Sequence, residues 1–156
     1  VFQAVRAAFS GTLGMRVSAT DWVEGGWTPE ETADFAVRLR QAGADFVHVS
    51  SGGVSPKQKI TVGPNYQVPF AQAIHAAIGM TTMAVGLITQ AQQANDIVAR
   101  ADADLVALAR AFLYNPRWMW QAAAELKAQV QASPQYWRCL PREAQHIFGD
   151  VRIGMR

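Results

Sequence analysis

The hydrophobic and polar positions along the chain follow two different periods. Runs with the period of two that is typical of strands occur at residues 13–18 and 45–50, and short apolar runs that also predict strands occur at residues 81–85 and 104–109. The longer segments between them repeat their apolar residues every three or four positions, which is typical of amphipathic helices. Strands that alternate with helices at short, regular spacing predict a parallel α/β sheet.

The clearest helix start lies at Thr28. Pro29 occupies the first helical position and Glu31 the third, so that Thr28 and Glu31 form a capping box. The helix is predicted to end at Ala42, with Gly43 as its carboxyl-terminal cap. Its apolar residues share one face and are expected to be buried: Phe35, Ala36, Leu39 and Ala42.

Further helices are predicted in four other parts of the chain, at residues 1–9, 69–78, 89–101 and 117–130. In the helix that begins at Thr89, the buried stripe is expected to consist of Ala91, Ala94, Val98 and Ala101. Beyond Pro134 the periodicity is lost, and a tail is predicted. The long loop at residues 51–68 is rich in glycine and proline, and loops of that length commonly carry function.

The composition indicates an ordinary globular protein. Half of the 156 residues are hydrophobic, 17% are charged, and the net charge of +2 is too small to indicate a nucleic-acid partner. No segment approaches the length of a membrane span. The single cysteine, Cys139, excludes an internal disulfide and fits a reducing, cytoplasmic location. The chain begins at Val1 inside a helical pattern, so we expect it to be cut from a longer protein.

The order of elements favours half of a (β/α)₈ barrel, because a complete barrel needs about 250 residues. No Gly-x-Gly-x-x-Gly sequence follows a strand, which makes a dinucleotide-binding Rossmann fold a weak alternative. The last two strands lead into turns at Gly86 and Arg110. In barrels of this kind the loops after the last strands commonly bind phosphate, so a phosphate site is predicted there.

Arg16 has an unusual position for a cation. Leu13, Met15 and Val17 share one side of the first predicted strand, and Arg16 lies on the other side. An arginine on the inner face of a parallel strand needs an anionic or polar partner, because burial of an unpaired guanidinium is costly. For Arg16, the alternative to binding a ligand is a structural ion pair with Asp21. For Arg110, the alternative to binding a phosphate is an ion pair with a carboxylate.

Several segments, in the same order, resemble the old yellow enzyme family, in particular its NADPH-dehydrogenase and xenobiotic-reductase branch: Arg16-Val-Ser-Ala-Thr-Asp21, Ser50-Ser-Gly-Gly53, Val62-Gly-Pro-Asn-Tyr-Gln-Val-Pro-Phe70, Ala84-Val-Gly-Leu-Ile88, Asp104-Leu-Val-Ala-Leu-Ala-Arg110 and Asn115-Pro-Arg-Trp118. The resemblance covers residues 1–138. It implies the carboxyl-terminal half of a TIM barrel, strands five to eight, with residues 1–133 as the FMN-binding half barrel and residues 134–156 as the tail.

The resemblance implies a role for particular residues. Arg16 would bind the pyrimidine edge of FMN, where a cation stabilises negative charge on the reduced flavin. Ala109 and Arg110 would bind the FMN phosphate, with Ala109 in place of the family's glycine, and Gly86 would let the backbone approach the same phosphate. Trp137 and Arg138 match a tail segment that reaches a neighbouring subunit's active site, although Arg138 is equally compatible with a solvated tail.

The chain departs from the family's pattern at two further positions. Asn65 stands where the family often has glycine, and asparagine tolerates positive φ. Met119 stands where the branch often has proline. His48 has no role in the resemblance, and it is expected to be a hydrogen-bonded core histidine. Tyr66 either lines the substrate entrance or packs in the interior.

The implied activity is that of an FMN-dependent oxidoreductase. NADPH would reduce FMN, and the flavin would pass hydride to the activated C=C bond of a small enone-like substrate. The family's substrate-binding and proton-donating residues lie in the amino-terminal half, so no catalytic residue and no metal ligand is assigned here. The chain alone is expected to bind FMN poorly and to be inactive, and its expected partners are the missing half or a second copy, in a homo-oligomer.

Two other functions stay open. A half barrel exposes the edges of its outer strands, so the chain is also compatible with a non-catalytic interaction module. The other alternative is half of another phosphate-binding barrel enzyme, such as an aldolase or a sugar-phosphate isomerase. The latter needs a catalytic lysine at a strand end, and no predicted strand ends in one.

Overall fold

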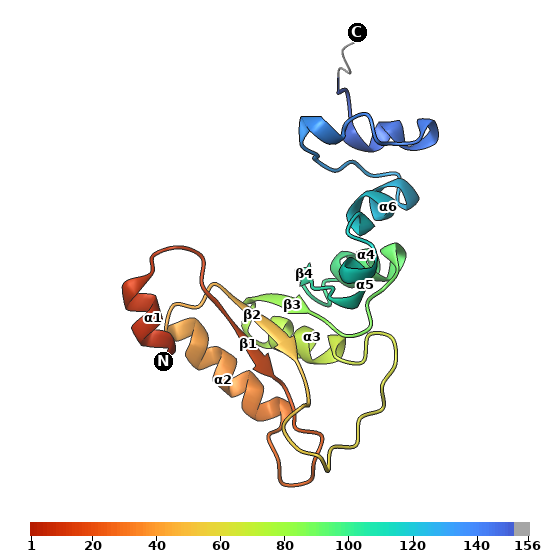
Figure 1. Ribbon diagram of the computed structural model, residues 1–156. Coiled ribbons are helices and arrows are strands. Elements are labelled where there is room, and N and C mark those ends of the chain that lie inside the picture. Colours follow the sequence, from red (N-terminus) through yellow and green to blue (C-terminus); the bar gives the residue numbers. More distant parts are fainter. Residues whose placement is uncertain (152–156) are drawn as a thin grey trace. The chain divides into compact units, whose positions relative to one another are not determined.

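A computed structural model describes residues 1–151, and Figure 1 gives the order of the elements. The chain forms two compact units. The first unit consists of Val1–Ile88 and Ala94–Leu108, and the second of Thr89–Gln93 and Ala109–Arg156. Each unit is described by itself. The domain boundary that the sequence predicts between residues 133 and 134 stays a prediction.

The first unit contains a parallel four-stranded sheet in the order β1-β2-β3-β4. The strands are β1 (Gly14–Ser18), β2 (Phe46–Ser50), β3 (Thr81–Ala84) and β4 (Leu105–Val106). The predicted parallel α/β sheet is confirmed. The fourth strand is shorter than predicted, although the backbone N–H of Ala107 still donates a hydrogen bond to the carbonyl of Ala84 at 2.8 Å.

Four helices connect or precede these strands: α1 (Phe2–Ala8), α2 (Pro29–Gln41), α3 (Val68–Ile78) and α4 (Ala91–Ala99). The capping box of α2 is confirmed, because the Glu31 N–H donates to Thr28 Oγ1 at 3.2 Å and the Thr28 N–H donates to Glu31 Oε2 at 2.9 Å. Helix α3 ends at Gly79, which adopts the left-handed conformation with φ of 57°.

The sheet has two unlike faces, as the period-two pattern predicted. One face is buried: α2 contacts β1, and α3 contacts β2 and β3 (Figure 1). Its strand residues are almost fully covered: Val17, Val47, Val49, Thr82 and Ala84. The opposite face carries Arg16, His48, Met83 and Leu105 in register. These side chains are partly or fully exposed, and Leu105 is 44% exposed.

The sequential strand order and the one-sided helix cover fit part of a (β/α)₈ barrel. In such a barrel the helices form the outer ring, and the inner face of each strand points toward the strands across the barrel. A doubly wound sheet differs from this arrangement, because it has helices on both faces. In a barrel of this kind, the exposed face of this sheet would be the inner one.

The buried stripe of α4 differs from the predicted one. Ala91 and Ala94 are buried as expected, but Ile97 is completely buried, whereas Val98 is 45% exposed. Ala101 is also exposed and lies beyond the end of the helix, with φ of 56°. The helix therefore packs through the positions 91, 94 and 97, because the larger Ile97 side chain removes more apolar surface from water than Val98 would.

The second unit is helical. It contains α5 (Arg110–Tyr114), α6 (Trp118–Glu125) and the 3₁₀ helices η1 (Pro134–Tyr136) and η2 (Arg142–Phe148). Helix α6 is shorter than the predicted 117–130, and the backbone adopts φ of 54° at Lys127 just after it. Trp118 is a core anchor, as expected: it is 9% exposed, and its indole N–H donates to the carbonyl of Thr89 at 3.0 Å.

The tail is more ordered than its sequence pattern indicated. Ile147 and Phe148 of η2 are buried and form a core cluster with Ala123 of α6. The N–H of Val130 donates to the carbonyl of Ile147 at 2.7 Å. The guanidinium of Arg117 lies 4.4 Å from the ring centres of both Trp120 and Tyr136, a double cation–π contact. Two adjacent apolar residues are too few to show a period, so the pattern missed this cluster. No helix within residues 1–151 is long and apolar enough to cross a membrane.

The corrected stripe of α4 makes a direct prediction. Ile97→Ala should lower the free energy of unfolding by about 2–5 kcal/mol, because it leaves a cavity in the core. Val98→Ala is the matched control and should change it by less than about 0.5 kcal/mol, since this side chain is half exposed. Urea denaturation followed by circular dichroism measures both. Equal losses of unfolding free energy in the two variants would instead support the buried stripe predicted from the sequence, which contains Val98.

Candidate functional site

The carboxyl ends of the parallel strands meet at one edge of the sheet, which is where ligands bind in α/β proteins. Left-handed backbone conformations gather in the segments that follow β1, β2 and β3. Their φ angles lie between 50° and 122°, at Trp22, Gly52, Gly53, Asn65, Gly86 and Leu87. A non-glycine residue in this region costs about 1–3 kcal/mol, and such strain is found preferentially at functional sites. This edge of the sheet is therefore the candidate functional site.

The loops after β1 and β2 pack on each other at this edge. The N–H of Gly52 donates to the carbonyl of Thr20 at 2.9 Å, and the N–H of Lys59 donates to the carbonyl of Trp22 at 3.1 Å. Gly52 has a φ of 73°, which a residue with a side chain rarely adopts, and a Cβ atom there would lie 3.4 Å from the Trp22 ring of the other loop. The glycine-rich loop is thus part of a defined surface.

The turn after β3 is tightly enclosed. Gly86 is buried and has a φ of 122°, and a Cβ atom there would lie 2.7 Å from Nε2 of Gln67 and 3.1 Å from the ring of Tyr66. The N–H of Asn65 donates to the carbonyl of Gly86 at 3.2 Å. Asn65 itself has φ of 63°, which confirms that this asparagine occupies a left-handed position. The Tyr66 ring lies against this turn and is partly exposed, so both of its expected roles stay predictions.

Arg16 projects from the exposed face of the sheet. Its Nε donates to Oγ of Ser50 at 3.3 Å, and the Ser50 hydroxyl donates to the carbonyl of Val17 at 3.0 Å. Within residues 1–151 Arg16 forms no ion pair. The alternative of an ion pair with Asp21 is wrong, because the carboxylate of Asp21 accepts a hydrogen bond from the N–H of Trp27 at 3.0 Å instead. The guanidinium thus keeps its Nη groups available for an anionic partner.

His48 is the register partner of Arg16 on the neighbouring strand. We expected a hydrogen-bonded core histidine, but the buried Nε2 atom has no hydrogen-bond partner in the part of the chain that the structure describes. Burial, and secondarily the positive charge of Arg16, hold the pKa of His48 below its ordinary value of 6.5. The imidazole is therefore neutral at pH 7, and Arg16 is the cation of this pair.

In the second unit, Ala109 and Arg110 lie at the start of α5, and both are exposed. The carbonyl of Ala109 accepts a hydrogen bond from the N–H of Leu113 at 3.0 Å. Arg110 makes no ion pair with any described residue, so the alternative of a structural pair with a carboxylate has no support. The flavin-binding roles of Arg16, Gly86, Ala109 and Arg110 stay predictions.

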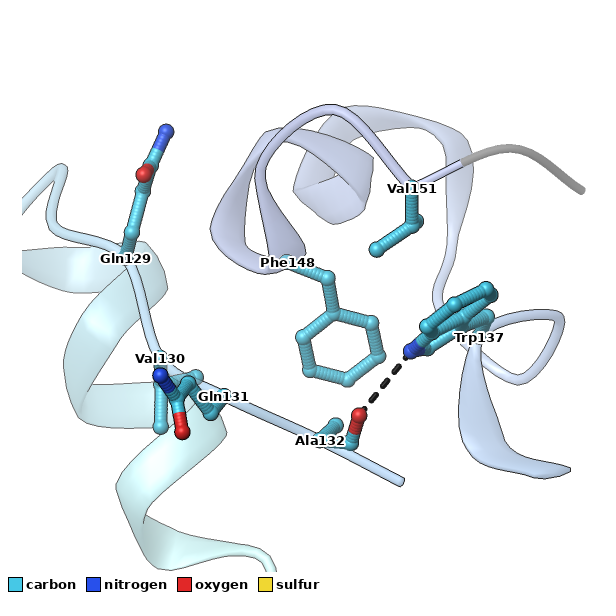
Figure 2. Close-up of a pocket in the computed structure, with 7 residues that line it drawn as sticks. All are labelled: Gln129, Val130, Gln131, Ala132, Trp137, Phe148 and Val151. Atoms are coloured by element: carbon cyan, nitrogen blue, oxygen red, sulfur yellow. Dashed lines mark hydrogen bonds between the residues drawn. The ribbon is translucent and has the colours of Figure 1, made fainter. Parts of the chain in front are cut away.

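Trp137 lines a cavity of about 490 Å³ in the second unit (Figure 2). The other lining residues come from the segment after α6 and from the end of the described chain: Gln129, Val130, Gln131, Ala132, Phe148 and Val151. The indole N–H of Trp137 donates to the carbonyl of Ala132 at 2.9 Å, and its ring packs on the core cluster of this unit. Arg138 is exposed. A contribution of Trp137 and Arg138 to a substrate or subunit-shared site stays a prediction.

Comparison with known proteins adds to this geometry. Residues 1–129 match the NADH:flavin oxidoreductase / NADH oxidase family. The chain belongs to that family. The match confirms the resemblance to the old yellow enzyme family. It includes both the exposed sheet face and the start of α5, where the candidate flavin-binding residues lie.

The chain is similar over 138 residues to bacterial NADPH dehydrogenases. It is 45% identical to that of Geobacillus sp. (strain WCH70) and 44% identical to that of Geobacillus thermodenitrificans (strain NG80-2). Over a segment of the same length it is 38% identical to that of Listeria innocua. These segments cover 88% of this chain but only 40% of each relative, so the chain spans about two fifths of the length of these NADPH dehydrogenases.

Sequence reasoning missed Gln67. This residue lies within one of the segments that resemble the family, but its type and position gave no indication of a role. Its side chain is 4% exposed. Its Oε1 accepts from the Ser51 hydroxyl at 2.9 Å, and its Nε2 donates to the carbonyl of Val85 at 3.3 Å. A polar residue just before a helix usually predicts an exposed cap, so only the folded contacts reveal that it is buried.

The environment of His48 makes a prediction for its titration. Arg16→Gln should raise the pKa of His48 part of the way toward 6.5, because the repulsive charge is removed while burial, the larger cause, remains. Arg38→Gln, on the exposed side of α2, is the matched control and should leave the pKa of His48 unchanged. NMR titration of the imidazole protons measures all three proteins. An unchanged pKa in Arg16→Gln would show that the two side chains do not interact.

The same lowered pKa has a consequence for stability. Below pH 6.5 the unfolded chain binds a proton at His48 more readily than the native protein does. Above pH 6.5, His48 therefore has no unfavourable effect on the free energy of unfolding. As the pH falls from 6.5 through the lower native pKa of His48, the free energy of unfolding decreases. Urea denaturation between pH 7.5 and pH 5 should show a smaller pH dependence for His48→Gln than for the wild-type chain.

Proposed function

We propose that this chain is the FMN-binding part of an NADPH-dependent oxidoreductase that reduces activated C=C bonds. The observation that carries the proposal is the Arg16 guanidinium, which lies on the exposed face of the sheet without an ion-pair partner among the described residues. A cation in that position suits an anionic ligand. Membership of a flavin oxidoreductase family and similarity to NADPH dehydrogenases support FMN as the ligand and NADPH as the reductant.

The residues fit such a ligand. FMN, when bound, would supply the hydride transfer between NADPH and the substrate. Arg16 would stabilise negative charge at the N1–C2=O edge of the ring, and neutral His48 beside it adds no second positive charge. Gly86 has a backbone conformation that other residues rarely adopt, at the sheet edge where backbone N–H groups commonly bind phosphate. In the second unit, Ala109 and Arg110 are the proposed phosphate-binding residues.

The fold proposal is the carboxyl-terminal half of a TIM barrel, strands five to eight. The exposed sheet face supports it, because Leu105 and the partly exposed Met83 would be covered by the strands across a barrel. The relatives are much longer than this chain, which supports a missing half as the partner. The proposal extends to a small enone-like substrate, a homo-oligomer, and a cytoplasmic enzyme without nucleic-acid or membrane partners.

The second candidate function is a non-catalytic interaction module. The same exposed sheet face favours it, together with the unpaired outer edges of β1 and β4 within the described sheet. The two candidates differ in one property. An FMN-binding chain takes up flavin, whereas an interaction module oligomerises without it.

Flavin titration of the 156-residue chain tests the proposal, with fluorescence and absorbance as the readouts. We expect weak but saturable binding, with FMN bound more tightly than riboflavin because riboflavin lacks the phosphate. Arg110→Gln should weaken FMN binding roughly 10- to 100-fold and leave riboflavin binding unchanged, since a hydrogen bond to a charged group contributes about 1.5–3 kcal/mol. Arg16→Gln should weaken both.

Arg38→Gln controls for the loss of one positive charge, because Arg38 is exposed on α2, the helix that contacts the covered side of the sheet. Its flavin affinities should match those of the wild-type chain. A colourless oligomer that takes up neither flavin would reject the proposal in favour of the interaction module. Equal loss of FMN affinity in all three variants would show that the arginines act only through net charge.

A further inference from the structure

Gln67 is a buried amide at the carboxyl edge of the sheet, and its two ends contact different segments. Its Oε1 atom accepts a hydrogen bond from the Ser51 hydroxyl, in the loop after β2, at 2.9 Å. Its Nε2 atom donates to the carbonyl of Val85, directly after β3, at 3.3 Å. Burial of an amide is unfavourable unless it forms such bonds. The side chain thus ties the ends of two neighbouring strands together.

The same side chain shapes the turn at Gly86. A Cβ atom on Gly86 would lie 2.7 Å from Nε2 of Gln67 and 3.2 Å from its Cβ, so the carboxamide occupies the space beside the glycine. The main chain of Gln67 is fixed in turn, because its carbonyl accepts from the N–H of Phe70 at 3.2 Å in the first turn of α3. Gly86 therefore packs directly against the start of a helix.

The turn needs such support. Leu87 has φ of 50°, a conformation that costs a non-glycine residue about 1–3 kcal/mol. A strained residue keeps its conformation only where its surroundings enforce it. On one side the N–H of Asn65 donates to the carbonyl of Gly86, and on the other side Gln67 bonds the carbonyl of Val85. The carbonyls of two consecutive residues, 85 and 86, are thus held by the segment just before α3.

We propose that Gln67 is a positioning residue that holds the Gly86–Leu87 backbone in the conformation that binds the FMN phosphate. The inference rests on the proposed function. Gln67 acts through the backbone and has no contact with the ligand in this proposal. A carboxamide suits the position because it offers an acceptor to the Ser51 hydroxyl and a donor to the Val85 carbonyl at the same time. Methionine has a similar length and offers neither.

The test compares the FMN and riboflavin affinities of Gln67→Met with those of the wild-type 156-residue chain. Loss of the positioned turn should weaken FMN binding roughly tenfold, about the effect of one hydrogen bond, and change riboflavin binding less than about twofold. Gln72→Met is the matched control: it makes the same substitution on α3, but Gln72 is exposed and bonds Asp102 at 2.7 Å. Its preference for FMN over riboflavin should equal that of the wild type.

Hydrogen exchange followed by NMR provides a readout without ligand. In Gln67→Met the amide of Asn65, which donates to the Gly86 carbonyl at 3.2 Å, should exchange roughly tenfold faster because the turn is no longer held, while those of Val47 and Val49 in β2 stay protected. Ser51→Ala removes only one of the two side-chain bonds and should shift both readouts in the same direction by less. This variant keeps the test valid if Gln67→Met does not fold.

The outcomes separate the two proposals. If the wild-type chain shows no preference for FMN over riboflavin, the proposed function fails, and the phosphate role of Gln67 fails with it. If the wild type prefers FMN and both variants keep that preference, only the role of Gln67 is overturned. Equal weakening of FMN and riboflavin would likewise overturn it, because a purely structural residue gives that result. Unchanged exchange at Asn65 would also overturn it, because the turn would then keep its conformation without the Gln67 carboxamide.

Discussion

The burial of alternate strand residues beneath α2 and α3 is the constraint on which the first unit depends. Val47 and Val49 are completely buried, and each intervening residue of β2 points to the other face. Apolar burial is the main favourable contribution to folding, so the covered face provides stability. The exposed face is thereby free to carry Arg16 and His48, two polar groups that would destabilise a sheet covered on both sides.

This rigid sheet also makes its carboxyl edge able to hold strained turns. Each left-handed non-glycine residue there, such as Asn65 or Leu87, costs free energy that the rest of the unit must offset. The strands offset it by fixing the ends of the turns through ladder hydrogen bonds and buried contacts. Gln67 belongs to the same arrangement, because its amide links the end of β3 to the loop after β2. The stability that the covered face of the sheet provides therefore maintains the geometry of the turns at its carboxyl edge.

Local sequence patterns predicted the features that depend on neighbours in the chain. The period of two gave the correct face for Arg16, and the Thr28 capping box gave the correct start of α2. The same reasoning failed where contacts between residues distant in the chain decide the structure. The choice of Ile97 over Val98, the burial of Ile147 and the bonds of Gln67 all depend on residues distant in the chain. For the candidate site, the pattern found the cation and the glycine turn but not the amide that supports the turn.

The charge balance of the exposed face links the fold to the proposed chemistry. Arg16 has no carboxylate partner among the described residues, and burial together with Arg16 keeps His48 neutral. Were the face covered by the remaining strands of a barrel, an unpaired guanidinium there would be strongly unfavourable. An anionic ligand removes that penalty, whereas an apolar protein partner does not. The proposed flavin site therefore accounts for Arg16 better than an apolar protein partner does, because the flavin supplies the missing negative charge.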